Sequence, residues 1–233
     1  MDIDKHLRSF LRGRDPALGA DPDLREASFD YCYNYFQSFR EQGCTHLLAS
    51  QDNLYQSCLT IGFFLASWDM LSRAPLADKS LKLYVPLVQY IASMEPQMWN
   101  IDVPNYTQPN ILRVLKCENL IVAALREQGI SVSVTLRTKI LLGVFGSVPA
   151  FDSNFSRWFE KQSGLREGGW YRETAQQALR ALKTFYEENQ SELDAYKIPT
   201  IDFMTGTPTS RVYPMAKIID MIGFKEGQRL GNE

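Results

Sequence analysis

Apolar residues recur at helical spacing along most of the chain. In residues 107–129, Ile111, Val114 and Leu115 fall on one face, which predicts an amphipathic helix ended by Gly129. The same spacing predicts helices over 21–43, 51–73, 80–94, 135–146, 149–164, 169–196 and 215–223. Because nearly every periodic stretch has a period close to that of a helix, we expect an all-α fold, a compact two-lobed helical bundle.

The segments between these helices are expected to be irregular. EPQMWNIDVPNYTQPN contains three prolines and no helical period, and IPTIDFMTGTPTSRVYP is rich in proline and threonine, so both are interpreted as loops. ISVSV, residues 130–134, alternates like a short strand but is too short for a sheet, which favours a tight connection. Pro86 is expected to kink its helix or to lie in the first turn. The stretch 51–73 is mostly apolar and should be buried on several sides.

The composition allows a single globular unit. With 45% hydrophobic residues, the chain can bury a core as one domain, 1–233, or as two packed lobes, 1–107 with 185–233 and 108–184. No run of about 18 apolar residues occurs, and the amino terminus is charged where a signal peptide is apolar, so no membrane contact is expected. The four cysteines are far apart and there are only two histidines, which argues against a disulfide framework or a metal site. We therefore expect a reduced, cytoplasmic, monomeric protein without a metal or other cofactor.

Charge is unevenly distributed along the chain, although the net charge is only −2. Residues 108–184 carry 11 Lys and Arg against 6 Asp and Glu, whereas both flanking segments are acidic. A basic central third gives weak support for a surface that binds a polyanion, because such charges usually cover solvated helix faces.

The segment KILLGVFGSVPAFDSNF, residues 139–155, places Asp152 after an apolar helix and a turn that contains Gly146 and Pro149. A buried carboxylate costs several kcal/mol unless it is paired or used. Two interpretations are open at this point. Asp152, or Ser153 beside it, caps the following helix, which contributes about 1 kcal/mol, or Asp152 is a catalytic carboxylate.

Residues 108–162 resemble the helix-hairpin-helix DNA glycosylases in the order of their elements. Two helices joined by a short connection are followed by a Gly/Pro turn and by an apolar residue, Asp and a polar residue at the start of the next helix. The resemblance implies a hairpin near Gly129 that binds DNA phosphates through backbone amides. It also implies that Asp152 is the catalytic aspartate, because a carboxylate stabilises the positive charge that develops on the sugar or activates water.

The position of the lysines bears on the type of glycosylase. In the lyase members of the family, a lysine begins the second hairpin helix. The matching place in this chain falls near Leu136, and Lys139 comes about one turn later. The resemblance therefore implies a monofunctional enzyme that uses water rather than an amine, with no cofactor.

A glycosylase also needs an aromatic pocket for the extruded base. The helical stretch GFFLASWDM supplies Phe63, Trp68 and Asp69 as candidates, and the loop QMWNIDVPNY adds Trp99. The alternatives are that Trp68 belongs to the core, that Asp69 pairs with Arg73 four residues on, and that Trp99 anchors its loop.

Phosphate contacts require exposed basic groups or free backbone amides. The candidates are Gly129 in the hairpin and the side chains of Arg137, Lys139 and Arg157. Each of these side chains is also compatible with an ordinary solvated surface. The expected partner is duplex DNA that carries modified bases.

GFFLASWDM together with TKILLGVFGSVPAFD resembles a widespread group of bacterial proteins, and glycosylase-like proteins of this kind occur among antiviral functions. The resemblances imply a monofunctional DNA glycosylase that excises a modified base, including from phage DNA. Two other functions stay open: a non-catalytic helical module that binds nucleic acid or protein, and a hydrolase of free nucleosides or glycosides. The last would need a second carboxylate near Asp152.

Overall fold

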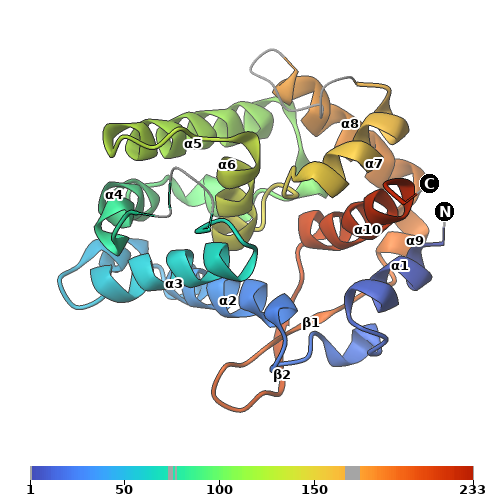
Figure 1. The fold of residues 1–233 in the computed structure, drawn as a ribbon, viewed down its shortest axis with the longest axis horizontal. Helices are drawn as coiled ribbons and strands as arrows, with labels where there is room; N and C mark the ends of the chain where they lie inside the picture. The colour runs from blue at the N-terminus through green and yellow to red at the C-terminus, as the bar shows by residue number, and fades with distance from the viewer. Residues whose placement is uncertain (1, 73–75, 77, 166–173, 233) are drawn as a thin grey trace.

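The computed structural model describes residues 2–72, 76, 78–165 and 174–232. Most of them are helical (Figure 1), so the expectation of a mainly helical fold is confirmed. The α-helices are α1 (Ile3–Phe10), α2 (Ser28–Glu41), α3 (Leu54–Ser67), α4 (Val85–Ala92), α5 (Gln108–Glu127), α6 (Val134–Ile140), α7 (Ser153–Ser163), α8 (Ala175–Glu188), α9 (Gln190–Leu193) and α10 (Met215–Leu230). A π-helical segment, Leu141–Phe145, continues α6, and short 3₁₀ turns lie at Pro16–Leu18, Arg25–Ala27, Thr45–Ala49, Leu81–Tyr84, Pro96–Asn100 and Val103–Asn105.

Two short strands depart from the all-α expectation. β1 (Pro199–Ile201) and β2 (Pro208–Val212) pair antiparallel within the segment that the sequence pattern assigns to a loop. The Ile201 N–H donates a hydrogen bond to the Asp30 carboxylate of α2 at 3.0 Å. The strand pair is thus hydrogen-bonded to a helix distant in sequence. In strands this short, such tertiary contacts matter more than an alternation of apolar and polar residues along the strand.

The ends of α5 and the start of α4 follow the sequence signals. Thr107 caps α5 through a hydrogen bond from the Asn110 N–H to its hydroxyl, and Gly129 beyond the other end has φ of +74°. Pro86 lies in the first turn of α4, where its missing N–H costs nothing. Residues 130–133 form a connection without strand structure, as the sequence favours.

Several predicted helices differ in length from those observed. α2 begins at Ser28 rather than near residue 21, and α7 begins at Ser153 rather than at residue 149, so Pro149 lies before the helix. α3 ends at Ser67 rather than continuing to residue 73, and Asp69 beyond it has a positive φ of +59° that stops the helix. α8 begins at Ala175, and residues 169–173 of the predicted helix lie outside the described residues. α10 runs on to Leu230, well past the predicted end at residue 223.

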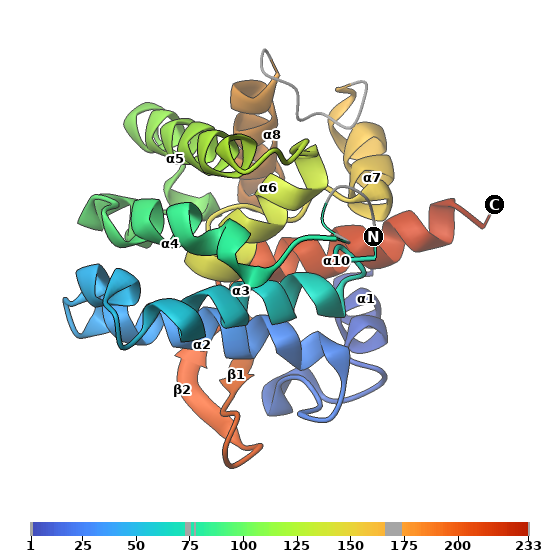
Figure 2. The same cartoon turned by 60° about the vertical axis from the view of Figure 1, so that its left-hand side comes forward.

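α10 lies between α7 and α1, as Figures 1 and 2 both show. Its contact with α7 is close because Gly227 has no side chain: a Cβ there would lie 1.8 Å from the Asn154 carbonyl oxygen. This packing brings the start of α7, and with it Asp152, against α10. None of the helices that the structure describes has the length and apolar character to cross a membrane.

Candidate functional site

The chain that leads into Asp152 is held by side chains from two helices. The Ala150 N–H donates to Asp220 Oδ1 of α10 at 3.0 Å, and the Phe151 N–H donates to Thr138 Oγ1 of α6 at 2.9 Å. Both bonds are buried, and buried N–H groups that lose their partners are costly. These bonds therefore fix the position at which Asp152 begins α7.

The turn before this connection requires a glycine. Gly146 ends the π-helical segment with φ of +65°, a conformation that side-chain-bearing residues rarely adopt. A Cβ at this position would also lie 2.6 Å from Pro214 Cγ and 2.8 Å from Tyr33 Cε2. The chain can reverse toward α7 here only because residue 146 has no side chain.

The two carboxylate oxygens of Asp152 have different surroundings. Oδ1 accepts hydrogen bonds from the Asn154 and Phe155 N–H groups, both at 3.0 Å, and so caps α7. Oδ2 lies 3.7 Å from Lys139 Nζ. The Asp152 side chain is 18% exposed. The capping interpretation is therefore correct for one oxygen, whereas the second is paired with Lys139, and both residues line a pocket.

This pocket, which we call the Asp152 pocket, combines two carboxylates, two ammonium groups and aromatic rings. It lies between α3, α6, α7, α10 and α1, and its walls include Asp152, Asp220, Lys139, Lys217, Trp68 and Phe10. The second carboxylate that the sequence could not place near Asp152 is Asp220.

Lys139 is buried in this pocket, with its side chain 7% exposed. Burial lowers the pKa of Lys139, and the neighbouring Asp152 carboxylate partly opposes that shift. Burial likewise raises the pKa of Asp152, while Lys139 and the capping N–H groups act in the opposite direction. Each group thus keeps the other charged in a site that disfavours either charge alone.

Lys217 forms a second buried ion pair at the base of the pocket. Its side chain is 2% exposed, and Nζ lies 3.0 Å from Asp220 Oδ2. The ammonium also lies 4.5 Å from the centre of the Phe10 ring and 5.0 Å from that of Phe29. Such cation–π contacts offset part of the cost of burying the charge.

The Trp68 indole lines the pocket and contacts two cationic side chains and an aromatic ring. Lys139 Nζ lies 4.9 Å and Arg25 Cζ 5.0 Å from the Trp68 ring centroid, and the Phe10 ring is stacked on the indole at 6.1 Å. The free space that remains is about 10 Å³, enough for about one water molecule. This space is too small for a nucleobase.

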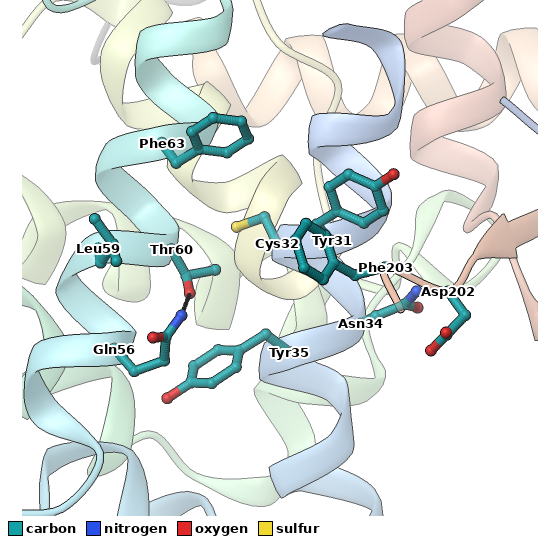
Figure 3. A pocket seen from close by; sticks show the side chains of 10 residues that line it. All are labelled: Tyr31, Cys32, Asn34, Tyr35, Gln56, Leu59, Thr60, Phe63, Asp202 and Phe203. Carbon is teal, nitrogen blue, oxygen red and sulfur yellow. Dashed lines mark hydrogen bonds between the residues drawn. The ribbon is translucent and has the colours of Figure 1, made fainter. Parts of the chain in front are cut away.

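The four predicted base-pocket residues do not meet in one place. Trp68 lines the Asp152 pocket, whereas Phe63 lines a separate cavity between α2 and α3 (Figure 3). Asp69 is exposed and accepts a hydrogen bond from the Ser72 hydroxyl, and the Arg73 proposed as its partner lies outside the described residues.

Trp99 is buried against the Phe145 ring, with centroids 4.7 Å apart, and belongs to the core. Its neighbour Asp102 accepts hydrogen bonds from the Met215 and Ala216 N–H groups at the start of α10. This loop therefore anchors α10, which is the second of the two roles that the sequence left open.

The predicted phosphate-binding residues are also dispersed. Arg137 pairs with Glu118 at 2.8 Å, and Arg157 donates a hydrogen bond to the Gly227 carbonyl at 2.8 Å. Gly129 turns the chain after α5. Lys139 is not on the surface but next to Asp152, although its place in the sequence is one turn later than the lysine of the lyases.

Sequence reasoning missed Lys217, Asp220 and Phe10. The signal for the first two is present in MAKIIDMIG, where a lysine and an aspartate three residues apart interrupt an otherwise apolar stretch. Charged residues at such positions are almost never buried unless they are paired. Phe10 offers no comparable signal, because an aromatic residue on a helix is usually part of the core.

Comparison with protein-family models, curated proteins and solved structures found no match. The functional argument for this chain therefore depends on its residues and their geometry.

Proposed function

We propose that this protein is a DNA N-glycosylase that removes a modified base from duplex DNA, including phage DNA, with Asp152 as its catalytic carboxylate. The observation that carries the proposal is the placement of Asp152 Oδ2. The cap leaves this oxygen free, and it faces an aromatic pocket 3.7 Å from the Lys139 ammonium. With one oxygen held by the cap and the other beside a cation, the carboxylate has a fixed position from which it could stabilise positive charge or accept a proton.

In the proposed reaction, the bond between the base nitrogen and the sugar C1′ breaks, and the electron pair leaves with the base, which takes up a proton. The ionised Asp152 stabilises the positive charge that develops on the sugar. A water molecule then adds its oxygen to C1′ and transfers a proton to Asp152 Oδ2. Lys139 keeps the carboxylate ionised within the pocket.

The free space of about 10 Å³ is too small for a base, and in the proposal the Trp68 side chain leaves its position to admit it. The indole is a flat aromatic group stacked on Phe10 and surrounded by cations. An extruded base is held between aromatic and apolar side chains in the same manner. In the proposal, the base takes the place of the indole and stacks on Phe10.

A second candidate activity follows from the position of Lys139. Burial favours loss of the Lys139 proton, and the neutral amine is suited to attack C1′. The base would leave with the electron pair of the broken C1′–N bond, and opening of the sugar ring at C1′–O4′ would give a covalent imine. This would add strand cleavage to base removal. Reduction with borohydride during the reaction traps such an intermediate as a stable protein–DNA adduct, whereas a water-dependent enzyme gives no adduct.

The test uses purified protein and duplex oligonucleotides that each contain one modified base, including the substituted cytosines of phage DNA. The wild-type protein should produce alkali-labile sites in at least one duplex. Asp152→Asn should lower the rate at least 100-fold, a loss of about 2.7 kcal/mol of transition-state stabilisation, without loss of the cap, because Asn caps helices about as well as Asp.

The matched control is Asp2→Asn. Asp2 caps α1 by accepting a hydrogen bond from the Lys5 N–H, as Asp152 caps α7. This variant should keep full activity. If every duplex stays intact, or if Asp152→Asn acts as fast as the wild type, the enzymatic proposal is refuted, and a binding module becomes the better explanation.

A further inference from the structure

α3 exposes an apolar stripe on its outer face. Tyr55, Leu59 and Phe63 are spaced four residues apart along the helix and are 69%, 37% and 56% exposed. The whole helix, LYQSCLTIGFFLAS, contains no charged residue. A helix that is apolar on most sides is normally buried, so this exposed face is expected to have a partner.

Two residues of the stripe, Leu59 and Phe63, form one wall of a groove, which we call the α2–α3 groove. Figure 3 shows Leu59 and Phe63 of α3 on one side and Tyr31 and Tyr35 of α2 on the other. Phe203, from the turn between β1 and β2, closes one end and meets the Tyr31 ring edge to face at 5.1 Å. The groove encloses about 560 Å³.

The polar groups that line the groove are engaged with the protein itself. Gln56 donates a hydrogen bond to Thr60 Oγ1 at 3.3 Å, and the Tyr35 hydroxyl lies 2.8 Å from Ser57 Oγ. Asn34 donates to the Ile201 carbonyl at 3.0 Å. A ligand in this groove would therefore be bound mainly through apolar contacts. Polar groups that could select one ligand over another lie at the edge of the groove.

The charge at the edge of the groove is negative. Asp202 lines the groove, and hydrogen bonds from Thr205 lower its pKa, which keeps it ionised. Asp21 and Asp23 are close enough to raise the pKa of Tyr31, although burial is the larger cause. No lysine or arginine is among the described residues that line the groove; Arg211 donates a hydrogen bond to the lining residue Asn34, and its charge is paired with Glu41 at 2.7 Å. A partner with basic side chains beside an apolar face is complementary to this surface.

The exposed area is larger than the groove and follows the repeat of a helix. Tyr55 and Met204, which is 84% exposed, lie outside the lining residues, so a small molecule in the groove would leave them uncovered. Residues four apart on α3 are about 6 Å apart along the helix axis, which matches side chains one turn apart on a second helix.

We propose that the α2–α3 groove docks an amphipathic helix of a partner protein, with its apolar side chains in the groove and basic side chains toward Asp202. The site lies apart from the Asp152 pocket and shares no lining residue with it. α3 contributes residues to both sites, but the docking proposal does not rest on the proposed base excision.

The test measures binding of a fluorescently labelled 16-residue Leu/Lys amphipathic helix by anisotropy. The full-length protein should bind this peptide, and the corresponding Leu/Glu peptide should bind at least tenfold more weakly. Phe63→Ala should weaken binding of the Leu/Lys peptide about tenfold, as expected when a central aromatic contact is removed. The matched control is Leu112→Ala, because Leu112 is 54% exposed on α5, away from the groove, and its loss should leave binding unchanged.

Equal binding of the two peptides, equal effects of the two substitutions, or no binding would each overturn the proposal. So would a concentration-dependent dimer that Phe63→Ala dissolves, measured by analytical ultracentrifugation, because the occupant would then be a second copy of this chain. Circular dichroism of both variants checks that the exposed substitutions leave the fold intact.

Discussion

The contact between Asp152 and Lys139 leads to a quantitative prediction. In a double-mutant cycle of Asp152→Asn, Lys139→Met and the combined variant, the free energies of unfolding should not be additive. Asp152→Asn keeps an acceptor for the helix cap and removes the charge. Lys139→Met removes the ammonium but keeps an apolar stem against Trp68.

The size of the coupling follows from the geometry. Two unit charges 3.7 Å apart attract each other by about 4 kcal/mol at an effective dielectric constant of about 20. Loss of water around both groups offsets part of this attraction, and Asp152 keeps some contact with solvent. We therefore expect a coupling energy of about 1–3 kcal/mol, which is within the range for residues in direct contact.

The assay is urea unfolding followed by circular dichroism for the four proteins at pH 7. Each single variant should be less stable than the wild type, because each leaves an unpaired charge in the pocket. The double variant should lose clearly less than the sum of the two. A coupling below about 0.5 kcal/mol, which is the error expected for independent sites, would refute the argument that the pair shapes this pocket.

Two further predictions concern stability. Gly146→Ala should lower the free energy of unfolding by more than about 2 kcal/mol, because residue 146 has a positive φ and a Cβ there would lie 2.6 Å from Pro214. Gly129→Ala should lower it by only about 1 kcal/mol, because the added Cβ would meet open space. Equal losses in urea or thermal unfolding would contradict this reasoning. Burial raises the pKa of Asp30 from 3.8 to about 7. Between these pH values the folded protein holds a proton that the unfolded chain has lost. The free energy of unfolding should therefore fall by up to about 4 kcal/mol as the pH rises from about 4 to 7. Asp30→Asn should remove this part of the slope in unfolding measured across that pH range, and an unchanged slope would show that Asp30 is not its source.

The sequence by itself determined most of the helices, because their signals are local. The apolar period in 107–129, the Thr107 cap and Gly129 define α5 without any reference to the rest of the molecule. The same holds for Pro86 in the first turn of α4. By contrast, β1 and β2 were missed because the strands are short and one of them is bound to Asp30 of α2, far away along the chain.

The sequence offered a helix cap as one of two interpretations of Asp152, but only the tertiary structure decided where the helix begins and what the second oxygen of Asp152 meets. Lys139 is 13 positions earlier, and it reaches Asp152 because the π-helical segment and Gly146 reverse the chain between them. Lys217 and Asp220 arrive from α10, which packs closely on α7 through Gly227. Helical periodicity describes contacts within about one turn, whereas a pocket is defined by elements that meet after folding. That is why the carboxylate could be named in advance and its cationic partner and second carboxylate could not.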